Sequence, residues 1–426
     1  MIPRRRFLRQ LATCSLGWGL GACASGRYLR ASGSGGRVVI VGGGYGGATA
    51  ARYLKRMNPD LTVTLIEPQD AYLSCPGSNE TIAGLGDGEA LVRSYDWLQQ
   101  ELDIRKVTAK VARLERSRRQ VVLQDGAEVP YDRLVLSPGI DFRWDAIEGY
   151  DEAASRIAPH AWKAGPQTAL LARQIRSMPD GGLVLITAPP NPYRCPPGPY
   201  ERASLIACYL KKHKPRSKVL ILDAKTRFSK QPAFEQAWRE LYGDMVEWIS
   251  SEKQGRLERV DAAARTVETE FDTFRADVLN VIPPQKAGLL ADQSGLTDSS
   301  GWCPVDPLSF ASVYDPAVHV IGDACQPGPM PKSAFSANSQ AKVCAAAIVA
   351  SLAGEPPAEP LLINHCYSFV ASDQAISITG VYGYSPDERQ LTIRSSGETP
   401  PHGDRRQEAN HARAWQRSFR KDVFGY

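Results

Sequence analysis

Several features are absent from this sequence, and each absence excludes a class of protein. The apolar run at 11–22 has about 12 residues and is too short to cross a bilayer, which needs roughly 20. No Cys-x-x-Cys-His segment occurs, so c-type haem is not attached to this chain. The six histidines are scattered and show no metal-ligand spacing. The net charge is +5, but four arginines and no acid lie in the first 23 residues, which leaves about +1 and no electrostatic footprint for nucleic acid.

The length and composition indicate a globular protein of several domains. The chain has 426 residues, of which 43% are hydrophobic and 23% charged. This length suggests two or three domains, and 8 Trp and 16 Tyr supply large side chains for a core. We find no internal repeat, and the only low-complexity tract is Ser-Gly-Ser-Gly-Gly at 32–36.

The N-terminal segment has the pattern of an export signal. Arg-Arg-Arg-Phe-Leu-Arg at 4–9 resembles a twin-arginine signal, and the alternative is an ordinary secretory signal with a basic start. Leu-Gly-Ala-Cys at 20–23 resembles a lipobox with Cys23 as the lipidated residue, and cleavage near Ala24 is the alternative. We therefore expect a signal at 1–23, a flexible linker at 24–36 and a periplasmic location.

A strand followed at once by a glycine-rich turn predicts a dinucleotide site. The β-branched strand 37–41 leads into the G-x-G-x-x-G pattern of Gly42, Gly44 and Gly47, and a helix is expected over 48–57. Gly42 allows the tight turn, Gly44 the approach of a pyrophosphate and Gly47 the packing of helix on strand. Glu67 ends the next strand, where a carboxylate binds ribose hydroxyls.

Two later segments favour FAD over NAD at this site. Residues 131–139, which end in Gly139, resemble the strand-plus-glycine motif of flavoproteins that bind two dinucleotides. Residues 318–323 resemble their late strand, whose final Asp323 binds the flavin ribityl chain. The alternative for Asp323 is a helix N-cap.

A second nucleotide-type domain is expected to have lost its nucleotide. The strand 183–187 is followed by a proline-rich loop, Ala-Pro-Pro-Asn-Pro-Tyr-Arg-Cys-Pro-Pro-Gly-Pro, at 188–199 instead of a glycine-rich loop. Prolines remove the backbone N–H donors that would bind a pyrophosphate. The next strand, 219–223, indicates that the wound fold is retained. Because the nucleotide site is expected to be lost, electrons must come from a small donor that reaches the flavin directly.

Two motifs of the chain are specific, Cys-Pro-Pro-Gly-Pro-Tyr-Glu at 195–201 and Pro-Met-Pro-Lys-Ser at 329–333. Together with the stretches 42–51, 78–80, 160–165, 194–204, 228–231, 282–285, 301–306 and 336–340, they carry a resemblance to a known family. From residue 37 to about residue 381 the chain resembles the flavoprotein subunit of flavocytochrome c sulfide dehydrogenase, and the sulfide:quinone oxidoreductases are relatives in the same superfamily.

The resemblance implies roles for three of the cysteines. Cys75 would be the thioether attachment to the flavin 8α-methyl carbon, although Pro76 and Gly77 depart from the bulkier residues expected there. Cys195 and Cys366 would form a redox-active disulfide. The alternatives are a free or structural Cys75 and a pair that is inert or purely structural. We expect Cys208, Cys325 and Cys344 to pack in the core as small apolar groups, and Cys303 has no assigned chemistry.

Two charged residues are further candidates, each with a plain alternative. Glu201 would manage protons beside the disulfide, or lie in a surface salt bridge. Lys332 would place positive charge near the flavin N1–C2 carbonyl, or be a solvated lysine. The segment 411–421 belongs to the expected interface domain, or forms an amphipathic helix on a membrane.

The predicted fold is α/β, with two Rossmann-like dinucleotide-binding-type domains of the glutathione-reductase kind and a small C-terminal interface domain. The predicted boundaries are 37–150 and 281–350 for the FAD-binding domain, 151–280 for the second nucleotide-type domain, and 351–426 for the C-terminal cytochrome-interface domain.

The predicted function is oxidation of hydrosulfide to sulfur or polysulfide, with electrons passing through FAD to a c-type cytochrome. The haem would belong to a partner subunit. The alternatives are a sulfide:quinone oxidoreductase at the membrane surface and a non-catalytic flavoprotein that binds an exported partner. The sequence leaves open the true sulfur donor and which cysteine is attacked first.

Overall fold

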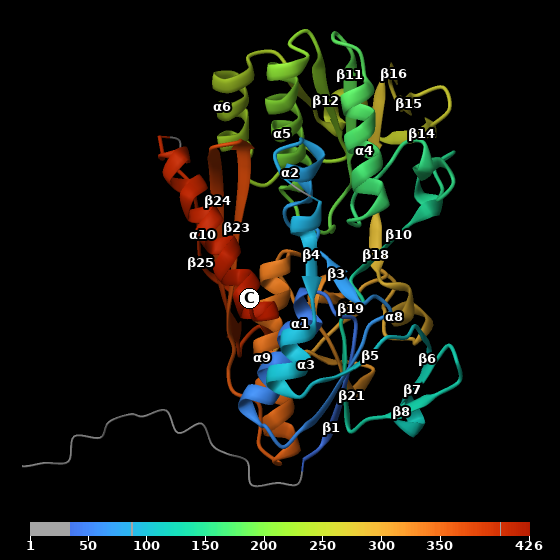
Figure 1. Cartoon of the computed structure of the whole chain (residues 1–426), viewed down its shortest axis with the longest axis vertical. Coiled ribbons are helices and arrows are strands. Elements are labelled where there is room, and N and C mark those ends of the chain that lie inside the picture. Colours follow the sequence, from blue (N-terminus) through green and yellow to red (C-terminus); the bar gives the residue numbers. More distant parts are fainter. Residues whose placement is uncertain (1–34, 87, 401) are drawn as a thin grey trace, which may run out of the picture. The chain divides into compact units, whose positions relative to one another are not determined.

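The structure, a computed structural model, describes residues 35–86, 88–400 and 402–426. The predicted export signal, Cys23 and most of the predicted linker lie outside the described residues. The described chain is α/β and contains two parallel sheets and a C-terminal antiparallel sheet (Figure 1). The predicted fold class is confirmed.

The first sheet is built from segments that lie far apart in the sequence. Its strand order is β20-β21-β9-β1-β2-β5, and all neighbours are parallel except β20. The central strands β1 and β9 are buried runs of Val, Ile and Leu after their first residue, as expected for a parallel sheet covered on both faces. Their bounds are β1 Arg37–Val41, β2 Thr62–Ile66, β5 Arg105–Val107, β9 Arg133–Leu136, β20 Ala311–Ser312 and β21 Asp315–Val320.

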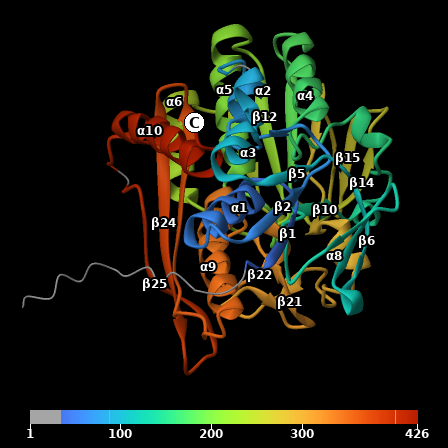
Figure 2. The same ribbon diagram turned by 60° about the horizontal axis from the view of Figure 1, so that its bottom comes forward.

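Helices α1 (Tyr45–Met57) and α9 (Ala334–Leu352) pack against each other beside this sheet (Figure 2). Helix α1 starts three residues before the predicted 48–57, because the chain is already helical directly after Gly44. The other elements near the first sheet are short: β3 Ala71–Leu73, β4 Val92–Ser94, β6 Val111–Glu115, β7 Gln120–Leu123, β8 Glu128–Pro130, β19 Cys303–Pro304, β22 Cys325–Gln326, α2 Ser78–Ile82, α3 Asp96–Leu102 and α8 Leu289–Gln293.

The second sheet, β13-β12-β11-β17, is parallel throughout and is drawn in green and yellow in Figure 1. It matches the predicted wound fold between the two halves of the first sheet. Its elements are β11 Leu183–Ala188, β12 Lys218–Asp223, β13 Val246–Ile249, β17 Val278–Val281, α4 Pro166–Ser177, α5 Gly198–His213, α6 Gln231–Tyr242 and α7 Ser251–Gln254. A small antiparallel sheet of β14 Leu257–Asp261, β15 Thr266–Thr269 and β16 Thr273–Arg275 follows, and β10 Ile140–Phe142 pairs with β18 Gln285–Ala287.

The C-terminal part is an antiparallel sheet and one long helix. The strands are β23 (Leu361–Ala371), β24 (Gln374–Ser385) and β25 (Gln390–Glu398), and helix α10 (Arg405–Phe424) packs on β24. Strand β23 also contacts α5 and α9, so this sheet joins elements of both parallel sheets. Within the described residues, no helix combines the length and the apolar character needed to cross a membrane.

Candidate active site

The glycine-rich turn between β1 and α1 accepts only glycine at two positions. Gly42 has φ +97°, and a Cβ there would lie 2.3 Å from the Ser137 carbonyl oxygen. A Cβ on Gly47 would lie 1.8 Å from the Gly42 carbonyl oxygen, so helix and strand touch backbone to backbone. Gly44 precedes the first residue of α1, and the N-terminus of that helix faces a cavity. Helix N-termini stabilise phosphate groups.

Glu67 completes this turn from the end of β2. One carboxylate oxygen accepts a hydrogen bond from the Gly43 N–H at 2.8 Å, and the other accepts from the Gln69 N–H at 3.1 Å. The carboxylate lines the same cavity as the turn, in the position where ribose hydroxyls are bound in this class of fold.

Asp323 offers the cavity an acceptor atom that has no partner. Its Oδ2 forms an ion pair with Nε of Arg194 at 2.6 Å, whereas its buried Oδ1 lacks a hydrogen-bond partner in the described chain. Asp323 lies in a 3-10 turn and makes no capping hydrogen bond, so the N-cap alternative does not hold. A buried carboxylate oxygen without a partner is costly, and a ligand hydroxyl would satisfy it.

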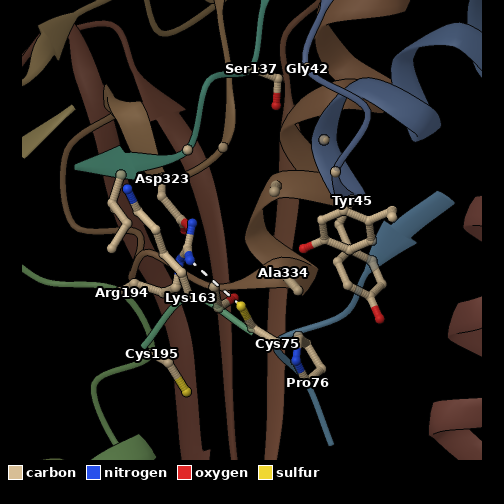
Figure 3. Close-up of a pocket in the computed structure, with 18 of the residues that line it drawn as sticks. Gly42, Tyr45, Cys75, Pro76, Ser137, Lys163, Arg194, Cys195, Asp323 and Ala334 are labelled. Atoms are coloured by element: carbon tan, nitrogen blue, oxygen red, sulfur yellow. Dashed lines mark hydrogen bonds and ion pairs between the residues drawn. The ribbon is translucent and has the colours of Figure 1, made fainter. Parts of the chain in front are cut away.

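The cavity has a volume of about 830 Å³ and brings together most of the predicted site residues (Figure 3). Gly47 and Lys332 lie outside its lining. The predicted residues that line it are Gly42, Gly44, Glu67, Cys75, Gly139, Cys195, Glu201, Asp323 and Cys366. The size of the cavity, the glycine turn and the unpartnered Asp323 oxygen fit a bound dinucleotide.

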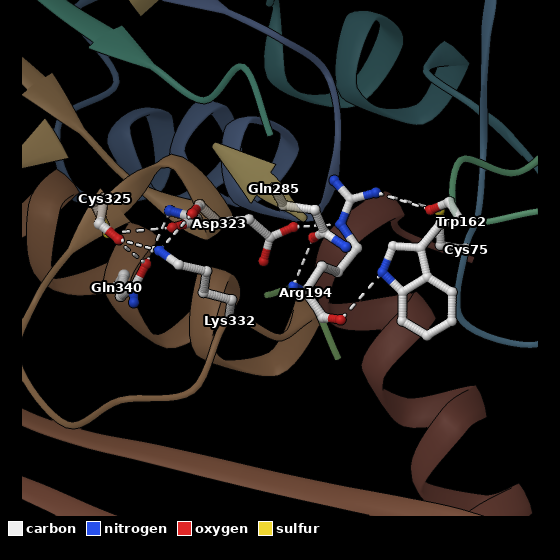
Figure 4. A network of polar contacts seen from close by, with 9 residues as sticks. Cys75, Trp162, Arg194, Gln285, Asp323, Cys325, Lys332 and Gln340 are labelled. Carbon is white, nitrogen blue, oxygen red and sulfur yellow. Dashed lines mark hydrogen bonds and ion pairs between the residues drawn. The ribbon is translucent and has the colours of Figure 1, made fainter. Parts of the chain in front are cut away.

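Lys332 lies behind the cavity and is not solvated. Its ammonium donates to the carbonyl oxygens of Asp323 and Cys325, both at 2.8 Å (Figure 4). It also sits 3.7 Å from the centre of the Trp302 ring. Its own carbonyl accepts from the Cys195 N–H at 2.7 Å. Lys332 therefore braces both the turn that carries Asp323 and the loop that carries Cys195. These contacts exclude the solvated lysine, and a positive charge near the flavin N1–C2 carbonyl stays a prediction.

Cys195 and Cys366 reach the cavity from separate elements. Cys195 lies in the loop before α5 with φ +56°, an uncommon left-handed conformation for a residue other than glycine. Cys366 lies on β23. Both are thiols in this structure. Burial raises the pKa of both thiols, and the nearby Glu201 carboxylate and Cys366 raise the pKa of Cys195 further.

Glu201 occupies the first turn of α5 and is held by two donors. Oε1 accepts from the Phe369 N–H at 2.8 Å, and Oε2 accepts from Nδ2 of Asn79 at 2.8 Å. It makes no ion pair within the described chain, so the surface salt bridge weighed as an alternative is not formed. Burial raises the pKa of Glu201, which suits a group that exchanges protons inside a cavity.

Cys75 is half-buried at the same cavity. Its Sγ lies 3.7 Å from Nη1 of Arg194 and 3.8 Å from the Trp162 carbonyl oxygen. The thioether remains a prediction. Cys325 and Cys344 are fully buried in the core, as expected of small apolar groups, whereas Cys208 is half-buried. Cys303, for which no role was predicted, is fully buried as well.

At the second sheet, side chains surround the end of β12, the place where a dinucleotide-binding domain would bind the ribose. Asp223 ends β12, and its carboxylate accepts from the Tyr200 hydroxyl at 2.5 Å and from Nε1 of Trp248 at 2.9 Å. Lys225 forms an ion pair with it at 2.6 Å, and Phe228 stacks on Tyr200 with ring centres 3.7 Å apart. These contacts are consistent with the predicted loss of the second nucleotide.

Models of known protein families match most of the described chain. The model of the central part of the sulfide dehydrogenase [flavocytochrome c] flavoprotein chain matches residues 168–283. The model of the flavin-binding part of flavocytochrome c sulphide dehydrogenase matches 358–424, and a pyridine nucleotide-disulphide oxidoreductase model matches 36–165. The sulfide dehydrogenase [flavocytochrome c] flavoprotein chain of Chlorobaculum thiosulfatiphilum is 56% identical over 43 residues, which are 10% of this chain and 90% of that sequence. The chain belongs to the family of flavocytochrome c sulfide dehydrogenase flavoprotein chains.

Two more distant relatives extend the comparison. The mitochondrial sulfide:quinone oxidoreductase of Dictyostelium discoideum is 23% identical over 377 residues, with 83% of this chain and 79% of that protein covered. The structure of the sulfide:quinone oxidoreductase from Aquifex aeolicus has a TM-score of 0.73 at 16% identity, with 92% and 93% of the two chains covered, which shows the shared fold. The membership also identifies FAD as the dinucleotide that the glycine turn and Asp323 fit.

Two charged residues of this family member were not predicted as site residues. Arg194 bridges Asp323 and Cys75, and Lys230 lies fully buried near Cys366. Both fall in stretches that carried the resemblance, at 194–204 and 228–231, which is the one signal that marks them in the sequence. Their contacts join segments far apart in the chain and have no local pattern.

Proposed function

We propose that this protein is an FAD-dependent oxidoreductase that oxidises hydrosulfide at Cys195 and Cys366 and passes electrons to a c-type cytochrome. The observation that carries the proposal is that one cavity is lined by all the groups the reaction needs. These groups are two cysteines from separate elements, the Glu201 carboxyl and the residues that fit a dinucleotide. The family membership supports the sulfur chemistry.

Four features of the chain would hold FAD. The glycine turn and the N-terminus of α1 would bind the pyrophosphate, Glu67 the ribose, and the unpartnered Oδ1 of Asp323 a ribityl hydroxyl. When bound, FAD accepts two electrons and releases them one at a time, which suits a haem acceptor.

The cysteines would perform the sulfur chemistry. In the oxidised protein Cys195 and Cys366 form a disulfide, and hydrosulfide attacks one of its sulfurs. The disulfide bond breaks, a new sulfur–sulfur bond gives a persulfide on that cysteine, and the negative charge passes to the thiolate of the other. Glu201 is the group placed to take the proton from the incoming sulfur, because its carboxyl faces the same cavity and is held by Asn79 and the Phe369 amide.

Cys75 would tether the cofactor. It lies on the same cavity, beside the guanidinium of Arg194, at a position that matches the attachment cysteine of the family. After acid precipitation the yellow flavin should stay with the wild-type protein and appear in the supernatant of Cys75→Ala. A wild-type supernatant that contains all the FAD would contradict the thioether.

The electron acceptor separates the two candidate functions. A c-type cytochrome is supported by the family of the chain, and a quinone by its relation to the sulfide:quinone oxidoreductases. The test is sulfide-dependent reduction of a c-type cytochrome and of a short-chain quinone by purified protein. We expect the cytochrome to be reduced and the quinone not. Reduction of quinone alone would support the second function.

Export through the twin-arginine route completes the proposal. The motif at 4–9 supports it, and this route carries folded proteins with their cofactor in place. Replacement of Arg4 and Arg5 by Lys should retain the protein in the cytoplasm, as measured by cell fractionation. Labelling with a radioactive fatty acid decides whether Cys23 is lipidated.

A further inference from the structure

Lys230 is a buried cation with no acidic partner. Its residue is 1% exposed, and it precedes the first residue of α6 with φ +60°. Its Nζ donates one hydrogen bond, to Oγ of Ser368 at 2.8 Å, and it forms no ion pair within the described chain. A buried ammonium is costly unless an anion compensates its charge.

The other buried lysines show what such compensation looks like. Lys225 has the Asp223 carboxylate at 2.6 Å and a backbone carbonyl, Lys332 has two carbonyls, and Lys214 has three. Among the described residues, Lys230 has one neutral hydroxyl and the Phe234 ring, whose centre lies 5.7 Å away, but no bonded carboxylate or carbonyl. Its charge is therefore available to a group that becomes anionic only during the reaction.

The hydrogen bond to Ser368 places the ammonium next to Cys366. The two residues are separated by one position on β23, in a stretch where the pairing with β24 is regular. Alternate residues of a strand point to the same face, so Cys366 and Ser368 present their side chains on the same side of the sheet. Lys230 thus approaches the strand on the side that carries the sulfur.

We propose that Lys230 is the fixed positive charge that stabilises the anionic sulfur of Cys366, as thiolate or persulfide, once the disulfide is opened. The inference rests on the proposed function and deepens it. Opening the disulfide transfers the negative charge of hydrosulfide to the cysteine pair, since one sulfur–sulfur bond is broken and one is made. A second negative charge follows when Glu201 takes the persulfide proton. Lys230 neutralises the charge on Cys366 without donating or accepting an electron.

The electrostatic surroundings agree with this role. Burial lowers the pKa of Lys230, while Cys366, Glu201, Cys195 and Glu398 act in the opposite direction, Cys366 most strongly. Burial raises the pKa of Cys366, and Lys230 is the largest influence that opposes it, ahead of hydrogen bonds with Ser333 and Asn364.

Two more titratable groups belong to the same surroundings. His365 directly precedes Cys366 on β23, and Tyr382 lies on β24 opposite Leu362. Burial lowers the pKa of His365 and Lys230 lowers it further, whereas burial raises the pKa of Tyr382 and Cys366 raises it further. A pH profile of the sulfur must therefore be compared between variants that leave these groups in place.

The test is the rate at which Cys366 is alkylated by iodoacetamide in the dithionite-reduced holoprotein, measured by mass spectrometry over a range of pH. Lys230→Gln removes the charge and keeps a donor for Ser368, and Lys230→Met removes both. At neutral pH we expect about a tenfold slower alkylation of Cys366 in each, because only the thiolate reacts and one pKa unit is a factor of ten. Lys230→Arg should restore the rate.

Lys225→Gln is the matched control, since it removes a buried lysine that is paired with Asp223 instead of lying beside the sulfur. It should leave the alkylation of Cys366 unchanged. An unchanged rate in Lys230→Gln, or an equal loss in Lys225→Gln, would overturn the proposal.

A comparison of the two cysteines in the wild-type protein tests the same assignment without a variant. Cys366 should be alkylated faster than Cys195 at neutral pH, because the Lys230 charge lies nearer to Cys366, and the reverse order would contradict the assignment. Sulfide-driven flavin reduction is measured on the same preparations. If sulfide fails to reduce the wild-type flavin while Lys230 still controls Cys366, the proposed function fails and this inference stands.

Discussion

The two parallel sheets differ in the residues that follow the carboxyl ends of their strands, which we call the first edge and the second edge. At the first sheet a glycine turn leaves the backbone open, and Asp323 keeps one carboxylate oxygen without a partner among the described residues. At the second, a proline-rich loop follows β11, and the Asp223 carboxylate is bonded by Tyr200, Trp248 and Lys225. The Asp323 carboxylate can therefore accept from a ligand hydroxyl, whereas the Asp223 carboxylate serves the packing of its neighbours.

We propose that the second edge serves sulfur chemistry in place of a nucleotide. The loop that would otherwise cradle a pyrophosphate carries Cys195, and α5 begins directly after it with Glu201 in its first turn. The C-terminal sheet then supplies Cys366 from β23. One side of the cavity thus fits the cofactor, and the other side presents the cysteines.

The largest effect is expected from replacing the cysteines on the second side. Cys195→Ser and Cys366→Ser should each abolish sulfide-driven flavin reduction, because either change removes the disulfide that hydrosulfide attacks. Dithionite should still bleach the flavin, since the residues that fit FAD are untouched. Stopped-flow absorbance under anaerobic conditions measures both. A Cys195→Ser protein that is reduced by sulfide at the wild-type rate would contradict the disulfide mechanism.

Gly181, which precedes the amino end of β11, is a control that separates the close contact at Gly42 from left-handed strain alone. Gly42 and Gly181 have φ of +97° and +94°, but a Cβ meets the Ser137 carbonyl at Gly42 and no atom within 4 Å at Gly181. Gly42→Ala should lose FAD and destabilise the protein by more than the 1–2 kcal/mol typical of left-handed strain alone. Gly181→Ala should cost only about that strain and keep the flavin. The readouts are flavin content and the urea midpoint of unfolding.

The two carboxylates allow a similar test with a smaller effect. Asp323→Asn should weaken FAD binding by about 1–3 kcal/mol, because a charge-assisted acceptor for the ligand is lost. Asp223→Asn should lower the stability of the fold and leave the flavin content unchanged, since its carboxylate bonds only to neighbouring side chains and backbone. Equal loss of flavin in both variants would argue against the difference between the edges.

The pH dependence of sulfide oxidation tests Glu201. Burial raises the pKa of this carboxyl, so it is protonated below that raised value and accepts a proton only above it. The rate of flavin reduction by sulfide should therefore rise with pH through the Glu201 pKa. Glu201→Gln should lower the rate by about 10²-fold and flatten this limb of the profile. An unchanged profile in Glu201→Gln would remove the residue from proton transfer.

Local sequence predicted the first edge well and the second only in part. A strand, a glycine turn and an acid after the next strand are contiguous signals, and the structure places Gly42 and Glu67 in one cavity as expected. The loss of the phosphate loop was visible in the prolines of 188–199. The link between Cys195 and Cys366 rested on the family resemblance, because it depends on how β23 packs against α5.

The contacts that no pattern predicted are those between distant charged groups. Lys332 was expected to place its charge near the flavin, but the sequence did not predict that the carbonyls of Asp323 and Cys325 hold its ammonium. Arg194 reaches Asp323 across 129 positions of sequence, and Lys230 reaches Ser368 across 138. Their partners are set by tertiary packing, which a single sequence does not encode at any fixed spacing.

One anaerobic titration tests the central claim, that the second edge has exchanged nucleotide chemistry for sulfur chemistry. NADH is added first to the purified wild-type holoprotein and then sodium sulfide, while the flavin absorbance is followed. We predict no bleaching with NADH and full bleaching with sulfide. Rapid bleaching by NADH, or none by sulfide, would contradict the account.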